Sequence, residues 1–269
     1  MFFRKVLVFV KRDFLIESSY KLQFILTWLN IFGSIAIFYF IAKLFGKEVS
    51  SHLGEYGGQY FPFAFIGIAF SGYLAIALTS FSRNIRTEQM MGTLEAIFLS
   101  PTNAAILIIA MSIWNFIFAS ISILIYFLFG VFFFGINLSN ANFFGAMIPF
   151  ILSIISFSSI GIISASFVMI FKRGDPITWG ITLFSNFLGG AYFPITVLPN
   201  NLQFVSRLLP STYSLRSIRL ALLQGYNYKM LISDISILLL FCFILLPISL
   251  LIFQYAVKKA KKDGTLVCY

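Results

Sequence analysis

The side chains that could carry catalysis or bind a metal are few and dispersed along this chain. There is one histidine, His52, with Glu48 and Glu55 near it in a glycine-containing polar loop. A catalytic or structural metal site needs three or four ligands at characteristic spacing, and this loop does not supply that pattern. The nine acidic residues are scattered, and Cys242 and Cys268 fall in different environments. We therefore expect no catalytic residue, no metal site and no cofactor in this chain.

Nucleotide hydrolysis by this chain is not expected either. A phosphate-binding loop reads G-x-x-x-x-G-K-[ST], because its backbone amides and lysine must surround the phosphates. The Gly46-Lys47 pair has no preceding glycine at the required spacing. Any ATP-dependent step would require a separate subunit.

The composition is that of an integral membrane protein. Of the 269 residues, 59% are hydrophobic and 10% are charged, and the mean hydropathy is +0.95. Ordinary globular domains are far less apolar and more charged. The net charge of +10 needs no nucleic-acid partner, because basic residues beside membrane spans anchor to anionic lipid.

Apolar runs without Lys or Arg that are long enough to cross a bilayer occur six times, and only the last contains an acid, Asp234. A hydrocarbon core of roughly 30 Å needs about 20 apolar residues of helix. The expected spans are 22–42, 60–82, 104–135, 143–171, 177–195 and 231–257. We therefore predict an all-α integral membrane fold, a single domain of residues 1–269 with six transmembrane helices.

The distribution of basic residues predicts which side of the membrane each loop faces. With the N-terminus inside, the inner segments hold 13 of the 19 Lys and Arg residues and the outer segments hold six. Lys and Arg are retained on the cytoplasmic side. We expect a multi-pass protein of the cell (inner) membrane with both termini in the cytoplasm.

Residues 1–20 have the pattern of an interfacial amphipathic helix. Phe3, Val6, Leu7, Val10 and Phe14 share one helical arc, and the basic residues of this segment share the opposite one. Such a helix lies on the inner leaflet before the first span. An ordinary charged lead-in is the alternative.

The short segment 83–101 between two apolar runs reads R-N-I-R-T-E-Q-M-M-G-T-L-E-A-I-F-L-S-P. Thr87 is placed to cap a helix that ends at Ser100, because the residue before proline avoids the α region. One face of this helix is apolar, with Met90, Met91, Leu94, Ile97 and Phe98. Gly92 predicts a bend or a close backbone approach. The pattern indicates a cytoplasmic amphipathic helix.

A second polar region, 196–229, follows the fifth run. It contains L-L-P-S-T-Y-S-L-R-S-I-R-L-A-L-L-Q-G, in which Ser211 is placed to cap a helix that ends before Gly225. Leu215, Ile218 and Leu222 share one face of that helix, and Arg216 and Arg219 lie beside it. Such a helix can re-enter the membrane from outside, although an ordinary interfacial hairpin has the same composition.

Both regions resemble type-2 ABC transporter permeases. Glu88, Met91-Gly92-Thr93-Leu94-Glu95 and Leu99-Ser100-Pro101 resemble the family signature E-x-x-x-G-T-L-E-x-x-x-x-S-P. The resemblance implies an ATPase-coupling helix whose residues are Arg86, Glu88, Met91, Gly92, Thr93, Leu94, Glu95, Ser100 and Pro101. The second region looks like the family's outer re-entrant segment. It implies an outer gate formed by Tyr192, Phe193, Pro194, Pro199, Pro210, Tyr213 and Arg219.

The resemblance also implies a function and partners. This chain would be the permease of an ATP-driven exporter, paired with a second permease copy and with two copies of a separate ATP-binding subunit, which would hold ATP and Mg²⁺. Because the 35 phenylalanines offer area without hydrogen bonds, they favour a lipidic, amphipathic or drug-like cargo, and family members also carry lipid-linked glycans.

Two other classes remain open from the sequence. A secondary transporter or channel would work without an ATPase, and it would be expected to carry midplane ionisable residues or an inverted repeat. A membrane-embedded enzyme such as a lipid transferase would need clustered acids, histidines or a metal set. Neither pattern is evident in the sequence.

Overall fold

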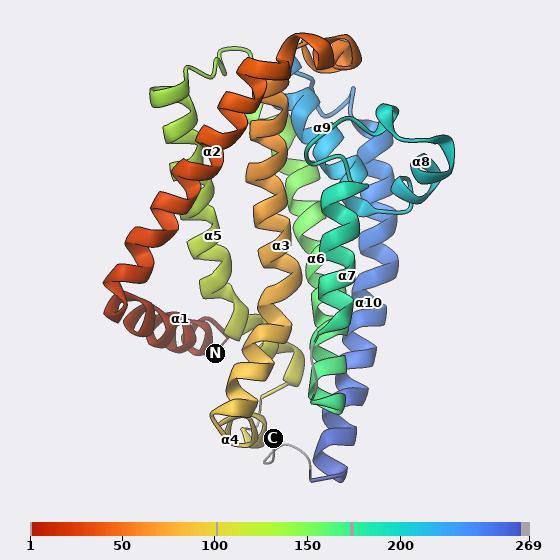
Figure 1. The fold of residues 1–269 in the computed structure, drawn as a ribbon. Coiled ribbons are helices and arrows are strands. Elements are labelled where there is room, and N and C mark those ends of the chain that lie inside the picture. The colour runs from red at the N-terminus through yellow and green to blue at the C-terminus, as the bar shows by residue number, and fades with distance from the viewer. Residues whose placement is uncertain (1, 101, 173–174, 265–269) are drawn as a thin grey trace.

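The computed structural model describes residues 2–100, 102–172 and 175–264, with side chains described throughout these ranges except at 2–5, 23–24 and 45–48. The described residues form helices and connecting turns and contain no strand (Figure 1). The helices are α1 (Phe2–Ser19), α2 (Lys21–Val49), α3 (Tyr60–Met90), α4 (Leu94–Leu99), α5 (Ala104–Phe134), α6 (Phe143–Phe171), α7 (Pro176–Phe187), α8 (Asn200–Ser206), α9 (Pro210–Gln224) and α10 (Ile232–Lys262). Three single 3₁₀ turns, η1 (Ser50–His52), η2 (Gly54–Tyr56) and η3 (Ile195–Val197), lie in the connections.

Among the residues that the structure describes, five helices are long and apolar enough to cross a membrane. They are Ile25–Leu44 within α2, and α3, α5, α6 and α10. The prediction of an all-helical membrane fold is therefore confirmed, and these five helices coincide with five of the six expected spans. Two of these helices extend past the expected spans at their polar ends, α3 to Met90 and α10 to Lys262.

The sixth expected span, 177–195, is not a continuous helix. The helix α7 has only 12 residues and ends at Phe187, so it is about 18 Å long against the roughly 30 Å of a hydrocarbon core. The chain turns at Gly189 and Gly190, and Gly190 has a left-handed φ of 80°. A Cβ on Gly189 would lie 2.2 Å from the Ser211 hydroxyl, so this turn packs tightly against α9.

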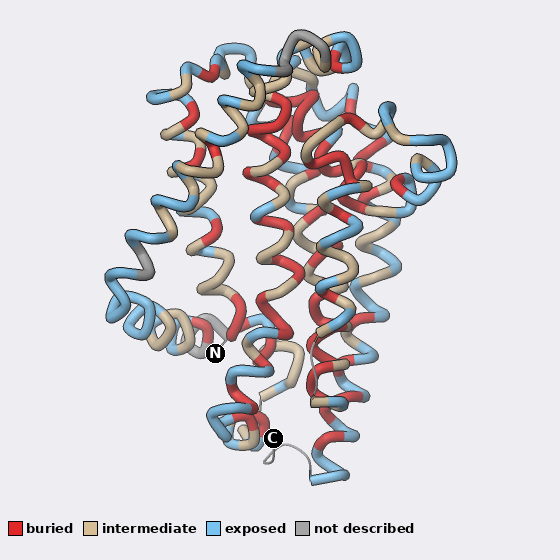
Figure 2. The backbone as a smooth tube through the Cα atoms, in the orientation of Figure 1, coloured by how far each residue is buried: buried red, intermediate tan, exposed pale blue. Residues whose placement is uncertain are grey.

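Helix α3 lies at the centre of the bundle, and α2 is the least buried of the five long helices (Figure 2). The packing partners of α3 include α5, α6 and α9. Small residues allow α6 to pack closely against α3, because a Cβ on Gly161 of α6 would lie 2.5 Å from the Leu78 carbonyl oxygen. Several α6 serines are buried, and Ser159 and Ser166 donate back to carbonyls one turn earlier.

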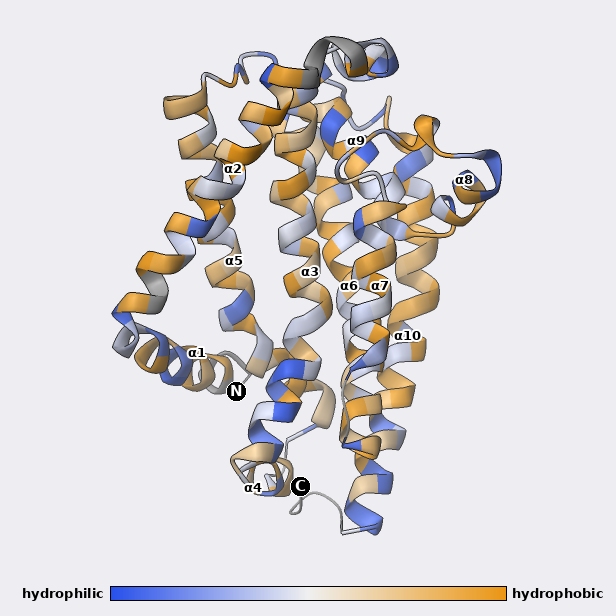
Figure 3. Ribbon diagram, viewed as in Figure 1, coloured by the Kyte–Doolittle hydropathy of each residue, from blue (hydrophilic) through white to orange (hydrophobic). Residues whose placement is uncertain are grey.

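Polar residues gather at one end of the bundle. The lower ends of α3 and α10 are the most hydrophilic parts of those helices, and α1 carries polar residues along its length (Figure 3). Helix α1 and the C-terminal end of α10 both lie in the lower half of the molecule (Figure 1). Helix α1 crosses this end at an angle to α2, and its exposed apolar residues include Leu7 and Phe14. Its place in a lipid interface stays a prediction.

Candidate functional site

The segment expected to form one helix from Thr87 is instead the end of α3, a turn and the short helix α4. Helix α3 runs through Thr87 to Met90, so the predicted cap at Thr87 is wrong. The break comes at Gly92, whose φ is 70°. A Cβ there would meet no atom within 4 Å, so the glycine provides the bend and not a close backbone approach. Thr93 precedes α4 without capping it by its side chain.

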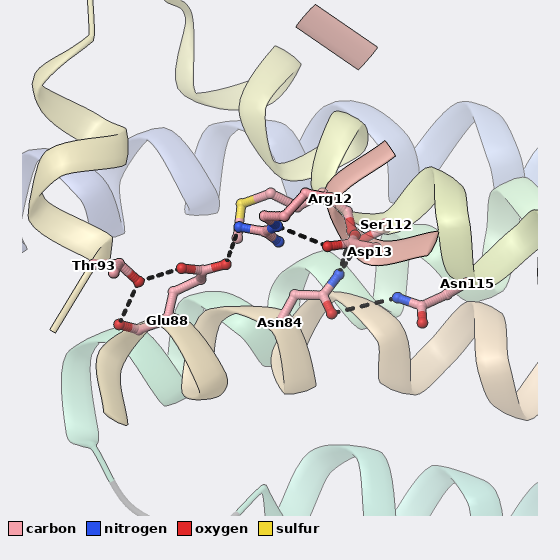
Figure 4. A network of polar contacts seen from close by, with 8 residues as sticks. Arg12, Asp13, Asn84, Glu88, Thr93, Ser112 and Asn115 are labelled. Atoms are coloured by element: carbon pink, nitrogen blue, oxygen red, sulfur yellow. Dashed lines mark hydrogen bonds and ion pairs between the residues drawn. The ribbon is translucent and has the colours of Figure 1, made fainter. Parts of the chain in front are cut away.

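Glu88 is the centre of a polar network at this turn (Figure 4). Its carboxylate accepts a hydrogen bond from Arg12 Nη1 at 2.7 Å and a short one from the Thr93 hydroxyl. The Arg12 Nε also donates to Asp13 at 2.7 Å. Only 6% of the Glu88 side chain is exposed, so these bonds compensate a carboxylate removed from water. Glu88 therefore ties α1 to the last turn of α3 and to the start of α4.

Burial and the new bonds shift the pKa values of Arg12 and Asp13 on α1. Burial raises the pKa of the Asp13 carboxyl, and the bond from Arg12 offsets only part of that effect. Desolvation alone would lower the pKa of Arg12, but its bond to Asp13 and the negative charge of Glu88 raise the pKa overall. Arg12 is thus held in the charged form that its two partners require.

A second set of bonds connects α3 to α5 one turn away. The Asn84 amide donates to the Met111 carbonyl at 2.7 Å and to the Ser112 hydroxyl at 3.2 Å, and it accepts from Asn115 at 3.3 Å. Gln89 donates to the Met169 carbonyl of α6 at 3.4 Å. The C-terminal end of α3 is thereby bonded to α1, α5 and α6.

The apolar residues of the turn point in two directions. Leu94 and Phe98 of α4 are buried, and the Phe98 ring lies 6.3 Å from that of Phe253 on α10. The Lys261 ammonium of α10 donates to the Phe98 carbonyl at 2.8 Å. Met90 and Met91, in contrast, are 67% exposed, so the prediction of one shared apolar face is wrong. The bend at Gly92 separates the two sets.

The other predicted coupling residues surround this turn without joining the network. Arg86 is exposed, Glu95 is half-buried, and neither forms an ion pair within the described residues. Ser100 has extended backbone angles and ends α4 as expected. Pro101 lies outside the described residues.

Sequence reasoning missed the partners of Glu88 and Asn84. Arg12 and Glu88 are far apart in the chain, so no local spacing indicated their contact. The only available signal was that Asn115 interrupts an otherwise apolar stretch inside the expected span 104–135.

Arg219 is the most unusual side chain of the outer segment. It is 2% exposed and donates to three backbone carbonyls, those of Phe63 at 3.0 Å, Gly190 at 2.7 Å and Ala191 at 2.7 Å. Its guanidinium carbon lies 3.6 Å from the centre of the Phe63 ring. No carboxylate among the described residues pairs with it. Carbonyl oxygens and an aromatic face therefore compensate this charge.

Gly67 of α3 makes room for this arrangement. A Cβ at this position would lie 2.0 Å from Arg219 Nη2 and 2.1 Å from the Ala191 carbonyl oxygen. Arg219 thus joins the start of α3 to the turn after α7, and any larger residue at Gly67 would displace it.

The remaining outer-gate residues are spread over this segment. Pro210 is the first residue of α9, and Ser211 does not cap that helix; its buried hydroxyl has no partner in the described part of the chain. The predicted end at Gly225 and the buried face of Leu215, Ile218 and Leu222 are confirmed. Tyr213 donates to the Arg207 carbonyl at 2.9 Å, and Tyr192 stacks on Phe38 of α2 with ring centres 5.7 Å apart. Pro194 is buried, Phe193 is half-buried and Pro199 is exposed.

Helix α9 is also held by an exposed ion pair. Arg216 binds Glu55 at 2.8 Å, and its Nη1 lies 3.6 Å from Asp234 at the start of α10. The bond to Glu55 raises the pKa of Arg216 despite partial desolvation. Asp234 lies beside this pair with 6% of its side chain exposed.

Comparison with protein families identifies the chain. A family model described as ABC-2 type transporter matches residues 4–223, which include both the Glu88 network and Arg219. The chain belongs to the ABC-2 type transporter family. Comparison with curated proteins gave no match. This ABC-2 protein is a multi-pass membrane permease of an ABC transporter, and permeases of this family typically work with an ATP-binding subunit.

Proposed function

We propose that this chain is the membrane-spanning permease subunit of an ATP-driven ABC exporter, and that the turn between α3 and α4 transmits the motion of a separate ATP-binding subunit. The observation that supports this most directly is the exposed apolar tip at the polar end of the bundle. Met90 and Met91 are each 67% exposed and Leu99 is 72% exposed, although the adjoining Leu94 and Phe98 are buried. Exposed apolar side chains on a polar surface are typical of a protein-binding site.

The base of this tip is suited to transmit force. Glu88 bonds to Arg12 and Thr93, and the Phe98 carbonyl accepts from Lys261. A displacement of the tip would therefore move α1, α3 and α10 together rather than bend one loop. Glu88, Gly92 and Glu95 are the residues that we assign to coupling, with Arg86, Met91, Thr93, Leu94, Ser100 and Pro101 around them.

The complete transporter would contain two permeases and two ATP-binding subunits, with ATP and Mg²⁺ held by the latter. We place it in the cell (inner) membrane, with both termini in the cytoplasm. In this orientation α7 and the turn that follows it together make the sixth crossing, and the segment with α8 and α9 forms the outer end. The cargo is lipidic, amphipathic or drug-like, with lipid-linked glycans included.

The outer gate in this proposal is the segment held by Arg219. Tyr192, Phe193, Pro194, Pro199, Pro210 and Tyr213 belong to the same segment. Because Arg219 bonds the turn at Gly190 and Ala191 to the start of α3, movement of α3 would pull on the outer segment. A single helix would then connect the ATP-driven tip to the outer end.

The test is to change the exposed methionines in the reconstituted complex with its ATP-binding subunit. We expect Met90→Glu combined with Met91→Glu to lower transport-stimulated ATP hydrolysis about tenfold, because burying two carboxylates at an interface costs more than about 1.4 kcal/mol. Met230→Glu is the matched control, because Met230 is 62% exposed and lies outside the tip. Unchanged hydrolysis in the double variant would contradict the proposal. Transport without any ATP-binding subunit would favour a secondary carrier.

A further inference from the structure

Three neighbouring cavities form a furrow along α3. The first, about 610 Å³, lies at the Glu88 network and shares Glu17 and Asn115 with the second, about 400 Å³. The second shares Thr27, Ile76 and Phe118 with the third, about 310 Å³. Helices α2 and α5, which both pack against α3, form its other walls (Figure 1). Each cavity lies within the size range of known ligand sites, about 300–1,000 Å³.

Polar side chains interrupt the mostly apolar lining of the furrow. Asn30 and Ser34 of α2 and Ser122 and Tyr126 of α5 line the third cavity. Tyr126 is 6% exposed, and its buried hydroxyl has no hydrogen-bond partner in the part of the chain that the structure describes. Ser80 lines the second cavity, and its buried hydroxyl also has no hydrogen-bond partner among the described residues. Within hydrocarbon such groups are costly unless a ligand bonds to them.

Opposite charges line the polar end of the furrow. Arg83 of α3 and Glu17 of α1 both line the second cavity, and neither forms an ion pair with any described residue. A guanidinium binds phosphate strongly, and a carboxylate binds an amine. An anionic headgroup would be repelled by Glu17, so the pair suits a headgroup that carries both charges.

Aromatic rings close the other end of the furrow. The Tyr126 ring lies 4.6 Å from that of Phe65, Phe65 lies 6.0 Å from Phe61, and Phe61 lies 6.0 Å from Phe134. Phe61 and Phe134 line a separate outer cavity of about 780 Å³. The rings therefore separate the furrow from the outer cavity.

We propose that this furrow is the headgroup path for a phospholipid-type amphiphile that carries a phosphate and an amine, while its acyl chains stay in the bilayer. The phosphate binds at Arg83 and the amine at Glu17, and the hydroxyls of Ser80 and Tyr126 bond to the polar headgroup as it advances. From Arg83 to Ile68 the furrow follows α3 for about 22 Å, which exceeds the roughly 15 Å of hydrocarbon in one leaflet. The direction of movement, but not the binding, rests on the proposed function as an exporter.

The test is lipid binding to the purified complex, measured by native mass spectrometry with phosphatidylethanolamine and phosphatidylglycerol as probes. We expect the unchanged protein to prefer phosphatidylethanolamine. Arg83→Gln should weaken binding of both lipids about tenfold, since a bond to a charged group contributes about 1.5–3 kcal/mol. Glu17→Gln should remove the preference between the two lipids. Lys259→Gln, an exposed cation near the end of α10 that lines none of the three cavities, is the control and should change neither.

The variant Tyr126→Phe is a second test, because it removes a hydroxyl that the proposal assigns to the furrow. Tyr255→Phe is its control, because Tyr255 lies on the exposed side of α10. We expect Tyr126→Phe to slow phosphatidylethanolamine transport and Tyr255→Phe to leave the transport rate unchanged. Equal binding of the two lipids by the unchanged protein, or no effect of Arg83→Gln, would overturn the furrow assignment even if ATP-driven transport of another amphiphile persists. Selective binding without ATP-dependent transport would support the furrow and refute the exporter.

Discussion

Glu88 and Arg219 are both buried charged residues, and the protein compensates their charges differently. Glu88 has an ionic partner, Arg12, and a hydroxyl donor, Thr93. Arg219 has three backbone carbonyls and an aromatic face. Removing one partner from a buried charge leaves an uncompensated group, which costs more than the bond itself contributes. Both residues should therefore be sensitive to small changes.

Glu88→Ala should destabilise the protein by about 2–3 kcal/mol, because it leaves Arg12 without its long-range partner and Thr93 without its acceptor. Thermal unfolding of the purified chain in detergent measures this. Glu95→Ala, a half-buried acid of the same turn with no ion pair among the described residues, should change stability by less than about 0.5 kcal/mol. Equal losses of stability in the two variants would show that the bonds of Glu88 do not stabilise the protein, and would contradict this prediction.

Arg219→Lys should be far from conservative. Lysine carries a compact charge and cannot direct a planar fork of donors at the carbonyls of Phe63, Gly190 and Ala191. We expect a loss of about 2–4 kcal/mol, measured by thermal unfolding, and Gly67→Ala should lower stability through the same contact because its Cβ would meet Arg219 Nη2 at 2.0 Å. If the two changes made together destabilise as much as their separate effects added, the two residues act independently and this account fails.

At this scale the sequence identified Glu88 and Arg219 but not what they contact. Their types and motif positions are local information, and the family resemblance selected them. The contacts of Glu88 with Arg12, and of Arg219 with Phe63, join segments far apart in the chain, and only the packing of α1, α3 and α9 determines them.

At the scale of elements, Gly92 sets the direction in which the tip projects. Its left-handed φ separates the exposed Met90 and Met91 from the buried Leu94 and Phe98. The sequence predicted a bend or a close backbone approach at this glycine, within one helix that starts at Thr87. The bend was predictable because glycine favours it, whereas the length of α3 depended on tertiary contacts of Glu88 and Gln89.

Gly92→Ala should strain the turn by about 1–2 kcal/mol, since a residue with a Cβ is disfavoured in the left-handed region. Because no atom lies within 4 Å of the added Cβ, the effect should come from the backbone alone. Gly92→Asn is the matched control and should retain more coupling, because asparagine tolerates this conformation better. Transport-stimulated ATP hydrolysis in the reconstituted complex distinguishes the two variants, and identical losses would contradict a conformational role.

The start of α7 depends on Asp175. Its carboxylate accepts from the Thr178 backbone amide at 3.0 Å and from the Ser164 hydroxyl. Burial alone would raise the pKa of Asp175, but the bonds from Ser164, Ser82 and Thr178 lower it overall. Because the folded pKa lies below the unfolded value of about 3.9, the stabilisation is complete above that pH and disappears as the pH falls through the folded pKa.

Asp175→Ala should therefore lower stability by about 1–2 kcal/mol at pH 7, as the loss of a helix cap does. The difference from the unchanged protein should shrink once the pH falls below about 4. Thermal unfolding at pH 7 and pH 3.5 measures this. A difference that is independent of pH would show that the charge of Asp175 is irrelevant.

At the scale of the whole molecule, composition and run length predicted the membrane fold and five of its long helices. They failed for 177–195, because hydropathy cannot tell an uninterrupted helix from a short helix followed by a packed turn. The turn at Gly189 and Gly190 exists because α9 packs against it and Arg219 binds its carbonyls. Such contacts leave no trace in a hydropathy profile.

The number of crossings can be measured by labelling single cysteines with a membrane-impermeant maleimide, after replacing Cys242 and Cys268 by serine. If the chain crosses six times, Lys11→Cys and Lys259→Cys should react only after the cells are permeabilised, and Arg207→Cys should react in intact cells. If α7 and its turn fail to cross, Lys11→Cys and Lys259→Cys would react from opposite sides. The background without added cysteines provides the control for non-specific labelling.

The two terminal helices of the chain meet at the same short turn. Arg12 of α1 bonds to Glu88, and Lys261 of α10 bonds to the Phe98 carbonyl. The base of the tip is consequently hydrogen-bonded both to α1 and to the C-terminal end of α10. Truncations that remove Arg12 or Lys261 are therefore not neutral changes. Loss of Arg12 breaks the bond to Glu88, and loss of Lys261 breaks the bond to the Phe98 carbonyl.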